Sequence, residues 1–427
     1  MSEGVDTVGM DTPPRLAVDR LLDDRETRII VCCGAGGVGK TTTAAALGVR
    51  AAGRGRKAVV LTIDPARRLA QSMGIDSLDN TPRKVETVGA GDGELHAMML
   101  DMKRTFDEIV EAHADGERAR AILANPFYQS LSAGFAGTQE YMAMEKLGQL
   151  RARDDWDLII VDTPPSRSAL DFLDAPKRLG SFLDGKFIRV LMAPAKVGGR
   201  AGMKFLNVGM SMMTGTLSKL MGASLLKDVQ TFVAAMDTMF GGFRTRADAT
   251  FRLLQAPGTA FLVVAAPEAD ALREAAYFVE RLAAERMPLA GLVLNRVHGS
   301  GAAQLSAERA SAAAENLEEG GIVDQESGKA GLRDSGAEPT EPTEPTEPSE
   351  PTEGDTAVVD RITAGLLRLH AERMQVIARE QRTRDRFTSL HPEVAVAEVA
   401  ALPGDVHDLA GLRAIGERLA AGVPAGA

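Results

Sequence analysis

The sequence has few of the residues that build zinc sites, disulfides or nucleic-acid surfaces. Its 427 residues include two cysteines, one tryptophan and 4% aromatic residues. The cysteines, Cys32 and Cys33, are adjacent, which excludes a CxxC pair for zinc or redox chemistry. We interpret them as small buried residues at the end of a strand. No basic patch is interleaved with aromatic residues, so nucleic acid is not expected as a partner.

Long hydrophobic runs are missing as well. The longest uncharged stretch in the middle of the chain, residues 205–218, is shorter than the ~20 residues that cross a bilayer. The first residues, MSEGVDTVGMDTPP, carry acidic groups and no apolar block, unlike a secretory signal or a transit peptide. We therefore expect a cytoplasmic protein and leave a peripheral position at a membrane open. Hydrophobic residues still make up 44% of the chain, which is enough for a large core.

The net charge of −10 is concentrated in one segment. Residues 315–355 carry 13 acidic and two basic side chains, so the remaining chain is close to neutral. The repeat EPTEPTEPTEPSEPTE, residues 338–353, places proline at every third position. Proline removes a backbone donor and the like charges repel one another, which disfavours a packed structure. We expect a disordered acidic tether over residues 299–356.

Short apolar runs alternate with segments of helical spacing along the rest of the chain. Strands are expected at residues 28–33, 57–63, 157–162, 260–266 and 289–295, with helical segments such as EADALREAAYFVERLAAE between them. This order predicts an α/β fold with a doubly wound, mainly parallel sheet. A helix over 356–387 and a strand within VAVAEVAALPGDV follow the tether, so the tether interrupts one domain.

One region departs from this order. Eight of the 18 methionines lie between Met192 and Met239, in segments such as GMKFLNVGMSMMTGTLSKLMG. Unbranched thioether side chains fill irregular cores and also line grooves for varied hydrophobic ligands. We expect an inserted helical, Met-rich subdomain, and both uses of its methionines stay open.

The stretch GAGGVGKT, residues 34–41, fits the phosphate-loop pattern G-x-x-x-x-G-K-[ST]. It follows a predicted strand and opens a predicted helix, which is the placement that phosphate binding requires. Backbone N–H groups of the loop surround the phosphates, the lysine adds a positive charge and the threonine hydroxyl coordinates Mg²⁺. The predicted nucleotide-binding residues of the loop are Gly34, Gly36, Gly37, Val38, Gly39, Lys40, Thr41 and Thr42.

Two carboxylates close strands that lead to the same edge of the sheet. Asp162 ends DLIIVD and has the Walker-B position, although a helix-capping aspartate would fit there too. Asp64 ends AVVLTID. One carboxylate can serve the metal while the other orients the attacking water, and position alone does not assign the two roles. Candidate metal ligands are Thr41, Asp64 and Asp162, and candidate catalytic residues are Lys40, Asp64 and Asp162. No guanine-reading N-K-x-D sequence follows, which favours ATP.

Three motifs in order carry a family resemblance: the loop, TIDPARRLAQSMG and DLIIVDTPPSRSALDFLDAP. Together they resemble the ArsA-type arsenite-pump ATPases and the guided-entry ATPases that target tail-anchored membrane proteins, within the MinD-like P-loop class. The resemblance covers residues 28–298 and 357–420. It implies that Asp64 is the switch I aspartate that positions the hydrolytic water and that Asp162 is the switch II aspartate near Mg²⁺.

The same resemblance implies two adenine contacts. Asn295 in LNRV matches an asparagine that reads adenine, and Pro403 in LPGDVHDL matches a segment that packs on it. The Asn295 amide can donate and accept at the adenine edge. A turn asparagine is an equally open interpretation from sequence alone.

The chain departs from the family in several places. The CxxC pair of the targeting branch is absent, as is the second glycine-lysine loop of the double-length pumps. Arg67 and Arg68 replace a histidine and an asparagine after the D-P-A motif.

Ala35 is a further departure, because the class typically reads G-K-G-G-V-G-K-T and its second residue is a lysine that reaches the partner's phosphates. The preferred hypothesis is a hetero-oligomer with a paralogous ArsA-like subunit that carries the missing lysine, similar to actinobacterial pairs. The alternative is a slow homodimer or monomer that uses Arg67 or another local cation.

These observations predict a Mg²⁺-dependent ATPase whose cofactors are ATP and Mg²⁺, coupled to anion transport or another membrane-associated process. The alternative is a nucleotide-gated targeting chaperone that binds hydrophobic clients through Met203–Met221. A P-loop kinase or a partitioning protein is less favoured. The expected segments are an extension (1–26), the ATPase core (27–185), the Met-rich subdomain (186–256), more core (257–298), the tether (299–356) and the last core segment (357–427).

Overall fold

The computed structural model describes residues 14–63, 68–86, 93–126, 128–129, 138–164, 242, 245–326 and 353–421. The strands are β1 (Ile29–Gly34), β2 (Lys57–Thr62), β3 (Arg83–Lys84), β4 (Glu94–Met99), β5 (Leu158–Asp162), β6 (Thr259–Ala265), β7 (Leu289–Val297) and β8 (Val396–Ala400). The helices are α1 (Val18–Asp23), α2 (Lys40–Gly53), α3 (Arg68–Ser72), α4 (Met102–His113), α5 (Gly116–Leu123), α7 (Thr138–Arg153), α12 (Ala269–Ala284), α13 (Ala307–Glu326), α14 (Glu353–Leu390) and α15 (Leu409–Ala421). Residues 245–255 are also helical.

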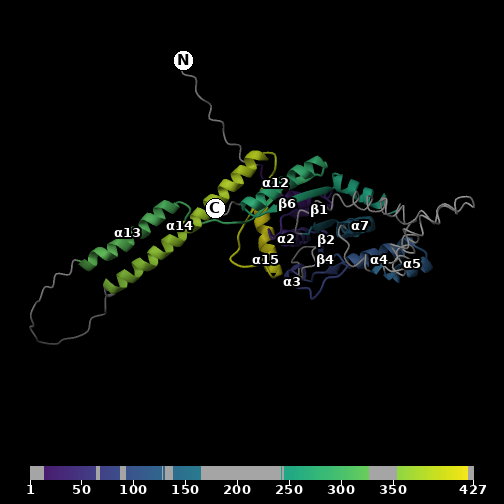
Figure 1. The fold of residues 1–427 in the computed structure, drawn as a ribbon, viewed down its shortest axis with the longest axis horizontal. Helices are drawn as coiled ribbons and strands as arrows, with labels where there is room; N and C mark the ends of the chain where they lie inside the picture. The colour runs from purple at the N-terminus through teal and green to yellow at the C-terminus, as the bar shows by residue number, and fades with distance from the viewer. Residues whose placement is uncertain are drawn as a thin grey trace, which may run out of the picture.

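The strands form one eight-stranded sheet in the order β3-β4-β2-β5-β1-β6-β7-β8. Its pairs are parallel except for β3 with β4. Helices cover both faces of the sheet (Figure 1). The prediction of a doubly wound, mainly parallel α/β fold is therefore confirmed. The central strand is β1, so the loop that follows it lies in the middle of the carboxyl edge.

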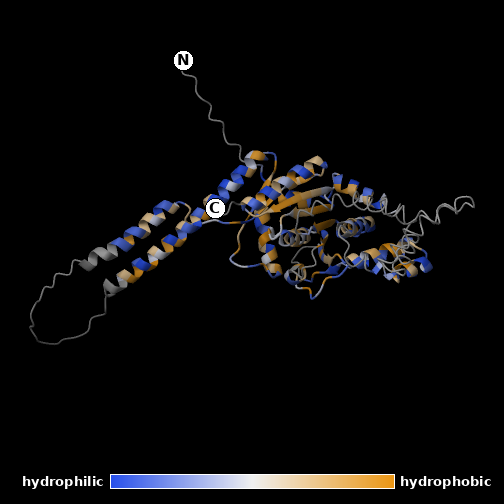
Figure 2. Cartoon of the chain, in the orientation of Figure 1, coloured by the Kyte–Doolittle hydropathy of each residue, from blue (hydrophilic) through white to orange (hydrophobic). Residues whose placement is uncertain are grey.

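The apolar strands are buried on both faces because each face carries its own helical layer. In β1, Ile29 and Val31 belong to the core with α4, α7 and α12. Ile30 and Cys32 belong to the core with α1, α2 and α15. This alternation follows from the two-residue period of a strand. Figure 2 shows the central strands as hydrophobic along their length, which is the pattern of a sheet covered on both sides.

Strand β4 was not predicted from the apolar runs of the sequence. Its sequence ELHAMM contains Glu94 and His96, so it is not a continuous apolar run. It nevertheless pairs in parallel with β2 along its whole length. Because β4 lies near the edge of the sheet, it tolerates polar side chains that a central strand would not.

The N-terminal segment joins the fold from residue 14. The backbone N–H of Leu16 donates to the carbonyl oxygen of Val396 at 3.0 Å. Leu16, Val18 and Leu22 are buried in the layer that contains α2 and α15. Within residues 14–26, expected as an extension, Arg15 and Leu16 thus lie against β8 at the edge of the sheet, and α1 packs in the layer of α2 and α15.

Helices α13 and α14 form a hairpin that extends away from the sheet (Figure 1). Residues 307–326 and 353–356 were expected within the disordered tether, and that part of the prediction is wrong because they form α13 and the start of α14. The buried residues that join the two helices are small: Ala310, Ala314, Ala364 and Ala371. Their helical spacing was hidden by the acidic composition of the segment. The proline repeat itself lies outside the described residues.

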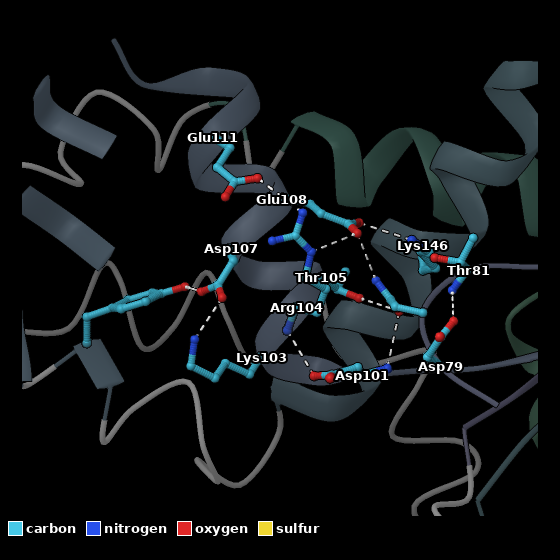
Figure 3. A network of polar contacts seen from close by, with 12 residues as sticks. Asp79, Thr81, Asp101, Lys103, Arg104, Thr105, Asp107, Glu108, Glu111 and Lys146 are labelled. Carbon is cyan, nitrogen blue, oxygen red and sulfur yellow. Dashed lines mark hydrogen bonds and ion pairs between the residues drawn. The ribbon is translucent and has the colours of Figure 1, made fainter. Parts of the chain in front are cut away.

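A polar network holds α4 against α7 (Figure 3). The Lys146 ammonium, whose side chain is 5% exposed, contacts the Glu108 carboxylate at 3.0 Å. The Asn80 amide donates to the same carboxylate at 3.2 Å, and Thr105 donates to the Asn80 oxygen at 3.1 Å. Burial lowers the pKa of Lys146, and Glu108 opposes that shift. The network thus holds α4 and α7 together on the face of the sheet where they share a core with side chains of β2 and β4.

The predicted Met-rich subdomain, residues 186–256, lies outside the described residues except for 242 and 245–256. Its methionines from Met192 to Met239 are therefore not placed. In the parts of the chain that the structure describes, no helix combines the length and the apolar character needed to cross a bilayer.

Candidate functional site

The loop between β1 and α2 has a backbone that requires glycine at specific positions. Gly34 has φ +149°, and a Cβ built there would lie 2.1 Å from the Val264 carbonyl oxygen of the neighbouring strand. Gly39, with φ +93°, precedes α2, and its Cβ would lie 2.2 Å from the Asn295 amide nitrogen. Both positions exclude a side chain by space as well as by backbone conformation. The loop is thus held close to β6 and β7.

Lys40 is the first residue of α2 and turns back over the loop. Its side chain is buried, and its Nζ donates a hydrogen bond to the Ala35 carbonyl oxygen at 2.8 Å. A buried ammonium at the N-terminal end of a helix adds its charge to that of the helix dipole. The geometry creates a positive region suited to phosphate at the centre of the carboxyl edge.

Three side chains from three elements meet beside this loop. The Thr41 hydroxyl donates to Oδ2 of Asp162 at 2.7 Å, and the Thr62 hydroxyl donates to the same oxygen at 2.9 Å. Asp162 is fully buried. Its position follows from register, since the parallel pairing sets Asp162 opposite Cys32 of β1 and Thr62 of β2. The sequence-predicted pair Thr41 and Asp162 is therefore brought together.

Thr62 was not among the predicted site residues. It lies at the carboxyl end of β2, the strand edge from which the site was inferred, so its position was a usable signal. Threonine is common in strands, however, and its hydroxyl marks a site only once β2 and β5 are known to be neighbours.

Hydroxyl and carboxylate oxygens are the donors that Mg²⁺ prefers. Thr41 and Asp162 supply one of each within hydrogen-bond distance, so the residues present fit this ion. Within the described part of the chain, no cluster of three or more histidine, cysteine, aspartate or glutamate side chains is arranged around a metal position. Thr41 and Asp162 are therefore the described residues that could hold a Mg²⁺ ion.

The two cysteines are buried at the end of β1, as the sequence interpretation stated. Burial raises the pKa of Cys33 to about 12. Burial also raises the pKa of Cys32 well above its usual value, and the nearby Asp162 carboxylate adds to this effect. A thiol with a raised pKa stays protonated near neutral pH, which disfavours a nucleophilic or metal-binding role for both residues.

Asn295 supports the loop from the end of β7. Its side chain is buried, and its Nδ2 donates to the Val38 carbonyl oxygen at 2.8 Å. The pairing of β7 with β8 shifts register between Asn295 and Val297, and Arg296 between them has φ +62°. Such an irregularity re-aims a side chain at the end of a strand. The adenine contact expected of Asn295 stays a prediction, and the structure adds a bond to the loop.

The remaining predicted residues are placed only in part. Pro403 is exposed in the segment after β8, which leaves the same carboxyl edge as β7. Its packing on adenine stays a prediction. Asp64 and Arg67 lie outside the described residues. The chain enters that segment from Ile63, whose carbonyl oxygen accepts a hydrogen bond from Gln139 of α7 at 3.0 Å.

Comparison with known proteins agrees with this geometry. The family model for anion-transporting ATPases, ArsA_ATPase, matches residues 27–317. This match includes the loop, Asp162 and Asn295. The chain belongs to the ArsA ATPase family. The resemblance inferred from the three motifs is thereby confirmed.

Relatives of this ArsA-family chain carry ATPase names. It is 26% identical to ATPase GET3 of Podospora anserina over 68% of this chain and 80% of that protein. It is 31% identical to ATPase GET3 of Malassezia globosa over 40% of this chain and 49% of that protein. It is 27% identical to ATPase BagA of Mycobacterium tuberculosis over 37% of this chain and 48% of that protein. The match thus spans about half the length of two of these three relatives.

Proposed function

We propose that this chain binds ATP with Mg²⁺ at the loop and hydrolyses it. The observation that carries this proposal is the convergence of Lys40, Thr41 and Asp162 at the carboxyl end of β1. Family membership supports it, because the matched model describes ATPases. A structural glycine turn would require neither a buried lysine nor a buried aspartate beside it.

Each residue has a distinct task in the proposed reaction. Lys40 exchanges its bond to the Ala35 carbonyl for bonds to phosphate oxygens and stabilises the charge that develops on them. Thr41 and Asp162 hold Mg²⁺ directly or through water, and Thr62 orients the Asp162 carboxylate. When bound, Mg²⁺ would supply positive charge that stabilises the negative charge of the phosphates. Asp64 is proposed to orient the attacking water.

Ala35 supports a second part of the proposal, which is that the site is completed by another subunit. Its methyl side chain is 9% exposed and packs in the apolar layer that contains Val38. A methyl group cannot neutralise a phosphate in a facing subunit. We propose a paralogous subunit whose loop retains the lysine and whose lysine completes the site on this chain. A cation of that kind contributes about 10³-fold or more to the rate when an arginine supplies it in other nucleotidases.

The test is ATP hydrolysis by the purified chain with Mg²⁺, alone and with the paralogous subunit. We expect slow turnover alone and at least a tenfold gain with the partner. The gain should disappear when the partner's loop lysine is changed to alanine. A family-typical rate for the chain alone that Ala35→Lys does not raise would contradict the two-subunit part. Failure of the chain to bind ATP at all would contradict the first part.

Family membership supports a proposal for the process to which hydrolysis is coupled. We propose transport of an anion or another process at a membrane, with the chain in the cytoplasm or at the membrane periphery. The alternative is a targeting chaperone for hydrophobic segments, which the similarity to ATPase GET3 favours. A photoreactive group placed at Met210 should crosslink to a hydrophobic peptide and not to a scrambled polar one if the chaperone function is correct. Equal crosslinking to both peptides would count against it.

A further inference from the structure

Helix α14 exposes a row of large aliphatic side chains to solvent. Six of them are 41–64% exposed: Val358, Val359, Ile362, Leu366, Leu369 and Val376. We refer to these six residues as the α14 stripe. Single exposed aliphatic residues are ordinary, but a contiguous set of six on one helix marks an interaction surface.

The spacing of the α14 stripe is that of a coiled-coil seam. From Val359 onward, the positions 359, 362, 366, 369, 373 and 376 alternate steps of three and four residues, and only Arg373 among them is polar. The buried Ala364 and Ala371 lie about half a turn away on the helix, on the side of α13. α14 therefore has two apolar faces. The face with Ala364 and Ala371 is covered by α13, and the face with the α14 stripe is exposed.

We propose that the α14 stripe binds the α14 stripe of a second copy of this chain in an antiparallel coiled coil. A narrow seam of alternating three and four steps is the pattern that another helix fills. The hairpin extends away from the sheet, so a second hairpin can lie along it (Figure 1). This interface does not use the nucleotide loop and goes beyond the proposed function.

The orientation follows from Arg373. In a parallel pair, equivalent positions face each other, so Arg373 would meet its own copy inside the seam, and like charges in contact are unfavourable. In an antiparallel pair centred between Leu366 and Leu369, Arg373 lies opposite Ile362, and its guanidinium stays at the side of the seam, where its Nε donates to the Gly299 carbonyl oxygen at 2.8 Å. Val359 then lies opposite Val376. The antiparallel arrangement buries every aliphatic side chain of the seam without pairing like charges.

The area is adequate for a specific dimer. Taking about 100 Å² of exposed surface for each of the six side chains, two stripes bury roughly 1,200 Å², the lower limit for stable interfaces. The segment that connects α13 and α14 does not have the composition to cover the stripe. Residues 327–352, which connect the two helices, contain one large aliphatic residue, Leu332, among proline, threonine and glutamate.

The first experiment measures the molar mass of the full chain by analytical ultracentrifugation without nucleotide. We expect a dimer whose dissociation constant rises at least tenfold in the double variant Ile362→Gln and Leu366→Gln. Tyr277→Gln is the matched control, because Tyr277 is 55% exposed on α12 and lies off the stripe. A wild-type monomer at every concentration overturns the proposal, as does a dimer that the stripe variant leaves intact. An interface across the loop would instead respond to Ala35→Lys.

The second experiment tests orientation by disulfide crosslinking. Because the native thiols are buried, an introduced cysteine reacts alone. The double variant Val359→Cys and Val376→Cys should form a crosslinked dimer on oxidation, whereas Val359→Cys alone should not, since its two copies would be about 26 Å apart. Crosslinking by the single variant would establish a parallel pair and contradict the proposal. Binding of the wild-type monomer to anionic lipid vesicles, lost in the glutamine variant, would assign the stripe to a membrane and also overturn it.

Discussion

The carboxyl edge of the sheet and the α13–α14 hairpin use side chains in opposite ways. At the edge, polar groups such as Lys40 and Asp162 are buried and hydrogen-bonded. Along the hairpin, the aliphatic α14 stripe is exposed. Buried polar groups that have partners form sites for small charged ligands, because desolvation strengthens their electrostatic effect. An exposed row of aliphatic groups gains free energy only when another macromolecule covers it.

The end of β7 connects these two regions. Asn295 bonds to the loop through Val38. Three residues later, His298 donates its backbone N–H to the Glu380 carboxylate of α14 at 2.9 Å, and its Nδ1 lies 2.6 Å from the other oxygen. A change in the loop that moves Asn295 would therefore act close to the base of the hairpin. The two surfaces therefore differ in chemistry but share one strand end.

The largest effect is expected from Lys40→Ala at the edge. Loss of the buried cation should lower ATP turnover by about 10³-fold, since this charge stabilises the transferring phosphoryl group. Turnover with Mg²⁺-ATP, measured together with the partner subunit, checks this.

Arg54→Ala is the control for Lys40→Ala. Arg54 lies at the opposite end of α2 from Lys40 and forms an ion pair with Asp23 on the surface. The Arg54→Ala variant should leave turnover nearly unchanged. Equal losses in the two variants would mean that the effect is one of folding and not of phosphate binding.

Replacing a glycine by alanine should have opposite effects on the free energy of unfolding at the sheet edge and in the hairpin. At Gly34, the new Cβ would lie 2.1 Å from a backbone oxygen that cannot move aside, so Gly34→Ala should lower the free energy of unfolding by about 3 kcal/mol. Chemical denaturation followed by circular dichroism measures this change.

The matched variant Gly365→Ala has no atom within 4 Å of the new Cβ in the middle of α14. It should raise the free energy of unfolding by about 0.5–1 kcal/mol, because alanine favours a helix. Destabilisation by both variants would contradict the close contact as the cause at Gly34.

The polar network between α4 and α7 tests whether buried charge matters away from the loop. Lys146→Met leaves the Glu108 carboxylate without its closest cation, and we expect a loss of about 2 kcal/mol in the free energy of unfolding. The double variant Lys146→Met and Glu108→Gln should recover part of the loss, as measured by a double-mutant cycle. An additive cycle would show that the contact contributes nothing specific.

The buried thiols predict a smaller effect of alkaline pH. The folded pKa of Cys33 is about 12 against an ordinary value of 9.0, so the unfolded chain releases this proton first as pH rises. The stabilisation is complete below pH 9 and is lost between pH 9 and about 12, with roughly 1 kcal/mol gone at pH 10. Cys33→Ala should flatten the dependence of stability on pH in this window. An unchanged slope would exclude the thiol as its cause.

Much of the candidate site at the carboxyl edge of the sheet could be predicted from local sequence. The loop residues are contiguous, and the spacing of their glycines and lysine is typical of a backbone loop that surrounds phosphate. Asp162 was found because it ends a continuous apolar run, and such runs were also sufficient to predict most of the parallel sheet. Strand β4 was missed because Glu94 and His96 break its apolar pattern, and α13 was missed because acidic composition obscured its alanine spacing.

The glycine-rich loop and the class of fold can be read from the amino-acid sequence, since both rest on short-range patterns of residues. The tertiary structure is needed to show that Thr62 shares the Asp162 carboxylate and that Asn295 supports Val38, because parallel pairing brings together strand ends that lie far apart in the chain. It also decided which face of α14 is exposed. The sequence shows two apolar rows on that helix, and the packing of α13 covers one row and leaves the α14 stripe exposed.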